Sequence, residues 1–469
     1  MTERPNRPAG LPRFVFPEIF RFYAERAARG EPPAGRLQSP AGLWLKFAGF
    51  ALAGLVPWLL AKLRPRPAFL RPPAPRTRGT LYFYNTLNQR DALRPAALRD
   101  STALTVSDRA ALEADAIVDR SAARRWAFVH LGRVLGEFLR GDADERRFIA
   151  DFGLRYLRSL GYRDLFNHLL AMTGPACVVM SNDHLTEHRT LLWCCRQARI
   201  PTVYLQHAAV TDRFPPLSFS HALLDGQDSL DKYGRAGPLE SKVSLVGIGK
   251  FSDLSAVHPH EPVRRIGICT KTFSEVARVR AVCEGLKQWF PALALRLRPH
   301  PGTARPDLER LQALCKAAGI RMSNAREESS AQFLREVDLV IAGNSSVLLD
   351  AAMLNVVPVY FGGMEPPETH PHDGRRSYCM GCYYGFGRDD YYGLRASGLC
   401  LRADALEDLR TAIAGAVAER PRIRERAKMY SETIGTRFDG HSDELIARCL
   451  EDIRAKRTPR LRPASEPGT

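Results

Sequence analysis

Several features that would place the chain in a common class are missing. The first residues, MTERPNRPAGLPRF, contain no apolar signal-peptide segment, so a cytoplasmic protein is expected. Zinc-finger spacing, an aromatic RNA-binding signature and a recognisable helix-turn-helix are also missing, which argues against nucleic acid as a partner. An uncharged apolar run of fifteen residues falls short of the roughly 20 that a membrane-spanning helix needs.

The ten cysteines do not form a paired metal-binding pattern. Cys379 and Cys382 have zinc-like spacing, but no second Cys-x-x-Cys follows, and Cys400 alone does not complete a site. We therefore expect no metal centre. We expect reduced, buried thiols at the cysteines that fall in predicted strands or helices: Cys177, Cys194, Cys195, Cys269, Cys283 and Cys315.

Length and charge set the broad class of the protein. A chain of 469 residues is too long for one ordinary core, which indicates two domains with extensions. Hydrophobic residues make up 45% and charged residues 25%, as in globular proteins. The 68 Lys and Arg against 51 Asp and Glu leave a net charge of +17. This balance favours anionic partners such as nucleotide phosphates, acidic polymers or anionic lipid.

Residues 1–78 form an Arg/Pro-rich leader that contains the apolar run, Phe47–Ala61. Tryptophans and lysines flank the run as interfacial anchors would, and arginines follow it. We expect residues 41–63 to form a helix on the inner membrane surface. A buried core helix and a true span remain open alternatives.

Residues 79–255 are predicted to form a first α/β domain. Short β-rich runs alternate with amphipathic stretches, which indicates a parallel, doubly wound sheet. The helical patterns lie at Trp126–Leu139, Phe148–Leu160 and Thr190–Gln197. The predicted strands are Thr80–Tyr84, Ala176–Met180, Thr202–Leu205, Ala222–Leu224 and Val243–Ile248.

Residues 262–436 are predicted to form a second Rossmann-like α/β domain, after a linker at Ala256–Glu261. Its strands and helices alternate from Arg265 to Phe361, and a long Gly- and Tyr-rich loop region follows. A closing helix is expected within 437–454 and a disordered basic tail at 455–469.

Two short motifs follow predicted strands of the second domain. Arg298-Pro-His300-Pro ends one strand, and Ser345-Ser346 comes between another strand and a helix. Ligands bind at the carboxyl ends of strands in an open parallel sheet, and helix starts suit phosphate. We therefore expect His300 and the two serines to grip the phosphates of a nucleotide. Alternatively, His300 is a loop residue whose hydrogen bonds are made within the protein. The serines could cap the helix, and capping is compatible with phosphate binding.

These motifs, with Asp350 and Leu205-Gln206-His207-Ala208 in the first domain, resemble a GT-B glycosyltransferase. The similarity covers roughly residues 170–450. It is closer to bacterial capsule, lipopolysaccharide and teichoic-acid enzymes: CDP-glycerol glycerophosphotransferases, capsule Kdo-transferases and the polysialyltransferase-like group. The resemblance implies two Rossmann-like domains that face each other across a cleft. These relatives often carry Gly where this chain has Ala208, which leaves the turn there and the role of His207 open.

The resemblance implies that the second domain binds the donor. His300 would donate to the leaving phosphate, with help from Arg298, the serine pair and, just after the first strand, Thr270 and Lys271. Asp350, one turn into the following helix, would accept ribose hydroxyls. An ordinary solvated helix charge is the alternative for Asp350.

The first domain is expected to hold the acceptor and the general base. His207 is the first candidate because an imidazole titrates near neutral pH. Asp183 is the second, acting as the base itself, by orienting a His or by binding acceptor hydroxyls. Acceptor-binding roles are predicted for Gln206, Asn182 and Glu187.

The scheme requires no metal or cofactor. Asp142-Ala-Asp144 is a literal DxD, but it precedes a helix and is better explained as helix N-terminal charge. The sequence thus predicts transfer of a sugar or glycerol phosphate from a CMP-, CDP- or UDP-linked donor to an anionic polysaccharide or lipid-linked acceptor. A non-hydrolysing UDP-sugar 2-epimerase and a non-catalytic membrane-associated assembly protein are the alternatives.

Overall fold

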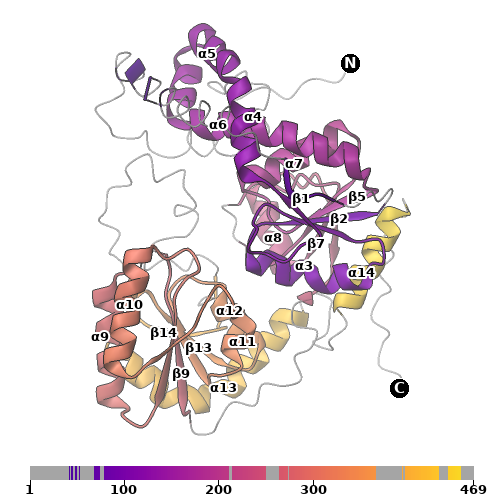
Figure 1. Ribbon diagram of the computed structural model, residues 1–469. Helices are drawn as coiled ribbons and strands as arrows, with labels where there is room; N and C mark the ends of the chain where they lie inside the picture. Colours follow the sequence, from indigo (N-terminus) through magenta and orange to yellow (C-terminus); the bar gives the residue numbers. More distant parts are fainter. Residues whose placement is uncertain are drawn as a thin grey trace, which may run out of the picture.

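The structure is a computed structural model. It describes residues 68–73, 79–210, 214–249, 263–272, 274–365, 393–394, 397–432 and 442–455, with residues 42, 44, 45, 48, 49 and 52. Two α/β domains follow one another along the chain, each built on its own sheet (Figure 1). The predicted α/β class with two parallel-sheet domains is confirmed.

The first domain contains an eight-stranded sheet in the order β1-β4-β3-β2-β5-β6-β7-β8. Only β1 runs antiparallel to its neighbour, β4. The strands are β1 (Phe69–Arg71), β2 (Thr80–Tyr84), β3 (Leu104–Ser107), β4 (Ala116–Val118), β5 (Cys177–Met180), β6 (Thr202–Leu205), β7 (His221–Leu224) and β8 (Lys242–Leu245). The helices are α3 (Leu87–Arg99), α4 (Arg120–Val129), α5 (Leu131–Arg140), α6 (Ala143–Thr173), α7 (Thr186–Gln197) and α8 (Gln227–Ala236).

The central strands β2 and β5 are buried along their whole length, which is why they read as continuous apolar runs. The chain passes from β2 to β3 and β4 on one side, then returns to β5 on the other. The sheet therefore changes winding direction between β2 and β5, and their carboxyl ends are the expected position for a ligand.

Three helices stand out from the first domain between β4 and β5 (Figure 1). The predicted helix Trp126–Leu139 is divided at His130, which ends α4, begins α5 and contacts Asp164 at 2.6 Å. The Asp142 side chain caps α6 in a reciprocal capping box with Glu145, so helix capping explains the first acid of the DxD motif. At Gly161 of α6 a Cβ would lie 1.8 Å from the carbonyl oxygen of Ala123, so only glycine lets α4 pack this closely.

The second domain contains a six-stranded, fully parallel sheet in the order β11-β10-β9-β12-β13-β14. The winding direction changes between β9 and β12. The strands are β9 (Arg265–Cys269), β10 (Ala294–Arg298), β11 (Arg321–Met322), β12 (Leu339–Ala342), β13 (Val357–Phe361) and β14 (Leu401–Ala403). The helices are α9 (Val276–Trp289), α10 (Arg305–Ala318), α11 (Ser330–Leu334), α12 (Val347–Met353) and α13 (Asp408–Glu432).

The last helix, α14 (Ser442–Arg454), returns to the first domain and packs beside α3 (Figure 1). Its apolar residues, with Leu450 among them, join a core cluster that contains Tyr82 and Leu93. Ion pairs fix both ends, from Arg99 to Asp443 at 2.6 Å and from Arg454 to Asp100 at 2.7 Å. The first domain is therefore completed by the end of the chain.

The leader differs from the prediction at its end. β1 lies within residues 1–78, where no strand is predicted from the sequence. A three-residue edge strand among prolines carries too little pattern to be recognised. No helix among the described residues is long and apolar enough to cross a membrane. Most of the predicted helix 41–63, the Cys379–Cys382 pair and the tail lie outside the described residues. The six cysteines predicted to be buried are confirmed as buried and free.

Candidate functional site

His300 lies just beyond the end of β10 with its ring fixed by neighbours. The Nδ1 atom is 3.0 Å from the backbone N–H of Gly302, which donates to it, and 2.9 Å from the Thr272 hydroxyl. Because Nδ1 accepts the backbone bond, the proton of the neutral ring sits on Nε2. His300 can therefore offer an Nε2–H donor to a ligand.

The His300 imidazole is neutral at physiological pH. The residue is exposed overall, although its ring is partly desolvated by neighbouring protein atoms. This desolvation, followed by the positive charges of Lys271 and Arg298, lowers the pKa of His300 to about 4. An anion bound beside the ring would oppose these effects and raise the pKa.

A pocket of about 440 Å³ opens beside His300, between the loops that follow β10 and β11. Its volume suits a small organic ligand. Thr303 lines the pocket, is buried, and has a hydroxyl without a hydrogen-bond partner in the structure. The other lining residues are Pro299, Pro301, Leu308, Gln312, Met322, Ser323, Asn324, Ala325, Arg326 and Glu327.

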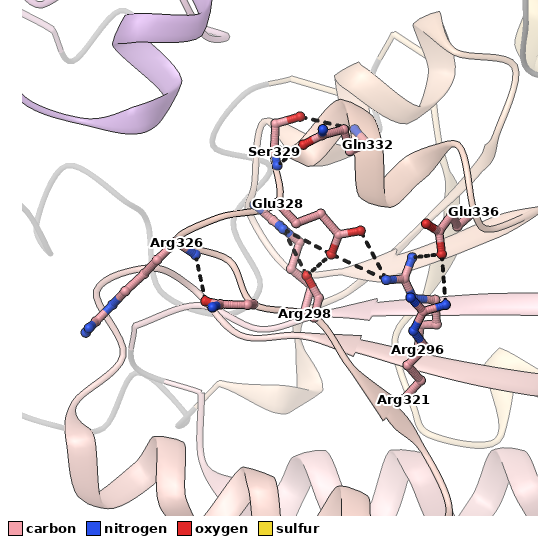
Figure 2. Close-up of polar contacts among 10 residues, drawn as sticks. Arg296, Arg298, Arg321, Arg326, Glu328, Ser329, Gln332 and Glu336 are labelled. Carbon is pink, nitrogen blue, oxygen red and sulfur yellow. Dashed lines mark hydrogen bonds and ion pairs between the residues drawn. The ribbon is translucent and has the colours of Figure 1, made fainter. Parts of the chain in front are cut away.

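Arg298 supports the wall of this pocket. Its guanidinium donates to the Ser323 hydroxyl at 3.1 Å and lies 3.9 Å from Glu328. Figure 2 shows how Glu328 also joins Arg296, at 3.1 Å, so that two arginines of β10 hold the loop after β11. Desolvation lowers the pKa of Arg298, and its contacts point toward this loop. A phosphate-binding role for Arg298 stays a prediction.

Lys271 and Glu365 form an ion pair at the carboxyl edge of the second sheet. Their side chains are buried, and Nζ lies 3.3 Å from Oε2. Desolvation lowers the pKa of Lys271, and Glu365 opposes the shift. A Cβ at Gly343 would lie 2.1 Å from Glu365 Oε1, so glycine is required after β12 for Glu365 to enter. The pair thus joins the ends of β9 and β13 around the point where the winding direction changes.

Thr270 and the serine pair lie on the same edge. The Thr270 hydroxyl is buried and has no hydrogen-bond partner in the structure. Ser345 Oγ accepts from the Val347 N–H at 3.3 Å, whereas Ser346 makes no side-chain cap. Both serines are half-buried. They do not line the His300 pocket, because β9 separates their strand from β10 by two strand spacings, about 10 Å.

Asp350 is buried in α12 and accepts a hydrogen bond from the Ser330 hydroxyl at 3.2 Å. The alternative of an ordinary solvated charge therefore does not fit. Its contact with α11 gives it a structural role, and ribose binding stays a prediction.

Asp183 and His184 form a buried dyad after β5 in the first domain. Asp183 Oδ1 lies 2.7 Å from His184 Nδ1, and Oδ2 accepts from the Tyr233 hydroxyl at 2.7 Å. The Tyr233 hydroxyl also lies 3.0 Å from that of Tyr204. Desolvation, then Asp183, raises the pKa of Tyr233 well above its usual value, so it stays protonated. Of the roles predicted for Asp183, its contacts favour orienting a histidine.

Two further histidines lie close to the dyad. His188 is fully buried, and desolvation, then His184 and His207, lowers its pKa well below the usual value. The fold therefore brings His184, His188 and His207 together. His207 is half-buried and follows Gln206, whose side-chain amide donates to the Ala208 carbonyl and the Ser229 hydroxyl at 2.9 Å each. Gln206 thus shapes the loop that carries His207.

The other predicted acceptor residues also have partners within the first domain. Asn182 Oδ1 accepts from the backbone N–H groups of His184 and Leu185 at 3.0 and 2.7 Å. Glu187 pairs with Arg120 at 3.3 Å and with Arg158 at 3.1 Å. Both residues position the start of α7, and their binding of an acceptor stays a prediction.

The carboxyl edges of the two sheets face each other. Asp91, the fifth residue of α3, follows β2 in the first domain, and its charge is the smallest of the influences on the pKa of Arg298 at the end of β10 in the second. Such an influence requires that Asp91 and Arg298, at the ends of the two sheets, lie within electrostatic range of each other. The His300 pocket and the first-domain histidines therefore border the region between the domains.

Sequence reasoning missed three residues of this edge, Thr272, Thr303 and Glu365. Thr272 and Thr303 lie within three residues of Lys271 and His300, so proximity to a motif was the available signal. The partners of Glu365 are 94 residues away along the chain or on another strand, so no local pattern could reveal it.

No family model and no curated protein matches the chain. Solved structures do match. A Listeria monocytogenes protein assigned as a UDP-N-acetylglucosamine 2-epimerase has a TM-score of 0.50 at 12% identity, over 82% of this chain and 98% of its own. MnaA of S. aureus, solved with UDP, has a TM-score of 0.51 at 9% identity, over 82% and 99%.

The chain has a GT-B-like fold. The wall teichoic acid polymerase TagF also aligns, with a TM-score of 0.48 at 8% identity, over 81% of this chain and 89% of its own. At these identities the likeness concerns the fold alone.

Proposed function

We propose that the protein is a transferase that moves a sugar or glycerol phosphate from a nucleotide-activated donor to a cell-envelope polysaccharide or lipid-linked acceptor. One observation carries the proposal: His300, whose ring is fixed through Nδ1 by Thr272 and Gly302, borders a pocket of about 440 Å³ at a carboxyl strand edge. A nucleoside fits such a volume, and its phosphates would reach the imidazole.

In this scheme the acceptor hydroxyl attacks the transferred group, and the bond to the leaving nucleotide phosphate breaks. The His300 Nε2–H donates to the leaving phosphate oxygen, where negative charge develops. Lys271 lies on the same edge, paired with Glu365, and would add a positive charge where a donor phosphate takes the place of that carboxylate. Nothing in this step requires a metal or a cofactor, because protein groups supply the donor and the charge.

The hydroxyl proton passes to a histidine of the first domain. His207 is the proposed base because it is half-buried and lies in the loop that the Gln206 side chain shapes. The Asp183–His184 dyad lies beside it, with the carboxylate 2.7 Å from Nδ1 of His184 and the Asn182 side-chain nitrogen 3.5 Å from Nε2. Asp183 itself is engaged by two partners, which favours orientation over direct proton transfer.

The first experiment tests donor binding and transfer separately. A panel of CMP-, CDP- and UDP-linked donors should contain one that raises the melting temperature, because a ligand selective for the native state stabilises it. His300→Ala should lower transfer from that donor by about 10²–10³. His168→Ala, on the exposed side of α6, is the matched control and should keep full activity. Wild-type transfer by His300→Ala would contradict the proposal.

A UDP-sugar 2-epimerase is the second candidate. Two solved structures with TM-scores of 0.50 and 0.51 are a protein assigned to that activity and MnaA with UDP, and a buried carboxylate, Asp183, follows β5 here. Isomerisation of a UDP-sugar in the absence of any acceptor would favour it. Transfer that depends on an added acceptor would favour the transferase.

A further inference from the structure

Exposed apolar side chains gather in one part of the molecule. On the leader, the described residues Trp44, Leu45, Ala48, Gly49 and Leu52 are helical, exposed and apolar, with Leu45 69% and Leu52 64% exposed. Their spacing places them on one face of a helix. A soluble helix normally turns such a face inward.

The outward face of α5 continues this pattern. Gly132, Leu135, Gly136 and Leu139 recur at helical spacing and point away from the core, which α5 meets through Val134 and Phe138. Leu139 is 50% exposed, and a Cβ added at either glycine would meet no atom within 4 Å. Among the described residues, therefore, nothing covers the two glycines of this outward face.

The leader helix touches α5 at Phe138, on the side of α5 that faces the core. The Trp44 ring meets the Phe138 ring edge-to-face, with centroids 5.0 Å apart. We name the residues Trp44, Leu45, Ala48, Gly49, Leu52, Gly132, Leu135, Gly136 and Leu139 the apolar patch. In Figure 1, α5 lies at the end of the first domain farthest from the second domain, so the patch is remote from the candidate site.

The leader sequence that carries part of the patch is basic. From Pro32 to Arg90 the chain contains nine Lys or Arg and no Asp or Glu. The single acid of α5, Glu137, contacts Arg133 at 3.1 Å and the buried Tyr156 hydroxyl at 2.8 Å, so its charge is neutralised and directed toward α6. Arg140 is exposed at the end of α5.

We propose that the apolar patch binds the interfacial zone of an anionic lipid bilayer, with Trp44 and the leucines inserted among the headgroups and with Arg140, at the end of α5, against lipid phosphates. Charge complementarity favours lipid over a second copy of the chain. A two-fold contact would bring the same cations of a +17 protein together. This inference is independent of the proposed chemistry.

Vesicle sedimentation of the full chain tests the proposal without any activity measurement. The protein should bind vesicles of phosphatidylcholine with about 30% phosphatidylglycerol, and bind pure phosphatidylcholine more weakly. Leu135→Asp with Leu139→Asp, and separately Leu45→Asp with Leu52→Asp, should each lower the bound fraction at limiting lipid by roughly tenfold or more. Leu98→Asp is the matched control, because Leu98 is 74% exposed on α3. This variant should bind vesicles as the wild-type protein does.

Circular dichroism establishes that each variant is folded, and Leu135→Ser with Leu139→Ser replaces the aspartate pair if that variant does not fold. Wild-type vesicle binding by a folded α5 variant would overturn the proposal, as would failure of the wild-type chain to bind anionic vesicles. A dimer in light scattering that the α5 variant converts to a monomer, with vesicle binding unchanged, would assign the patch to self-association instead.

Discussion

His300 illustrates how a few neighbours set the chemistry of one residue. Gly302 and Thr272 fix the ring through Nδ1, while desolvation and two nearby cations keep it neutral. A neutral imidazole fixed in this way can donate through Nε2 without first releasing a proton. Because the pKa of His300 is lowered to about 4, an anion bound beside the ring would raise it.

We expect donor binding to be coupled to proton uptake at His300, where the second proton would lie on Nδ1, replace the bond from Gly302 and point to the Thr272 hydroxyl. Between its free pKa of about 4 and the higher pKa in the complex, the complex holds more protons, so affinity should rise as the pH falls. Each unit of that rise adds about 1.4 kcal/mol of binding. Calorimetry in two buffers at pH 5.5 measures the uptake, with a diphosphate donor that does not itself titrate there. Equal uptake by His300→Gln would contradict the assignment.

The Thr272 hydroxyl is expected to strengthen binding of the nucleotide donor by fixing the His300 ring. Thr272→Val removes the hydroxyl at 2.9 Å from Nδ1, but it leaves the bond from Gly302 in place. Donor affinity should fall by about 0.5–1.5 kcal/mol, the usual net worth of one hydrogen bond. Thr272→Ser keeps the hydroxyl and should restore binding. Titration calorimetry compares the three, and equal affinities would show that the hydroxyl has no role.

At the scale of elements, α3 is held at both of its ends. It starts directly after β2 at the carboxyl edge of the first sheet, and its other end is ion-paired with α14. α14 comes from the end of the chain, so a distant segment stabilises the helix beside the candidate site. This packing is mostly apolar, which makes it sensitive to lost volume.

Leu450→Ala in α14 should lower the free energy of unfolding of the first domain by about 2–5 kcal/mol, because it leaves a cavity against α3. Urea unfolding followed by circular dichroism measures the change. Arg448→Ala, at an exposed position of the same helix, should stay within about 0.5 kcal/mol of wild type. Equal midpoints for the two variants would show that α14 does not stabilise this domain.

At the scale of the whole molecule, the two sheets approach each other through their carboxyl edges. Asp91 and Arg298 give the approach an electrostatic component across the two domains. A donor in the second domain and an acceptor in the first could react only if these edges come together. Domain approach should therefore affect transfer more than donor binding.

Asp91→Lys places a like charge opposite Arg298 and should favour separation of the domains. Donor affinity should stay within about threefold of wild type, while transfer should fall by about tenfold, since a few kcal/mol can shift such an equilibrium. Small-angle scattering with bound donor should give a larger radius of gyration than for wild type. An unchanged radius together with unchanged transfer would show that this pair does not influence domain approach.

The sequence alone determined the local elements and their order. Strands β2, β5 to β10, β12 and β13 and helices α9, α10 and α12 follow from short β-rich runs and helical periodicity, which are properties of neighbouring residues. The short strands β1, β3, β4, β11 and β14 are not predicted from the sequence. The position of His300 at a strand end follows from the same patterns. The buried cysteines follow from their places in these elements.

Only the tertiary structure decided how these parts combine. It placed β9 between β10 and β12, so His300 borders a pocket that excludes Ser345 and Ser346. It paired Lys271 with Glu365, joined Asp183 to Tyr233, and brought Trp44 against Phe138. Each of these contacts joins residues 50 or more positions apart. Such contacts depend on strand order and packing, which neighbouring residues do not encode.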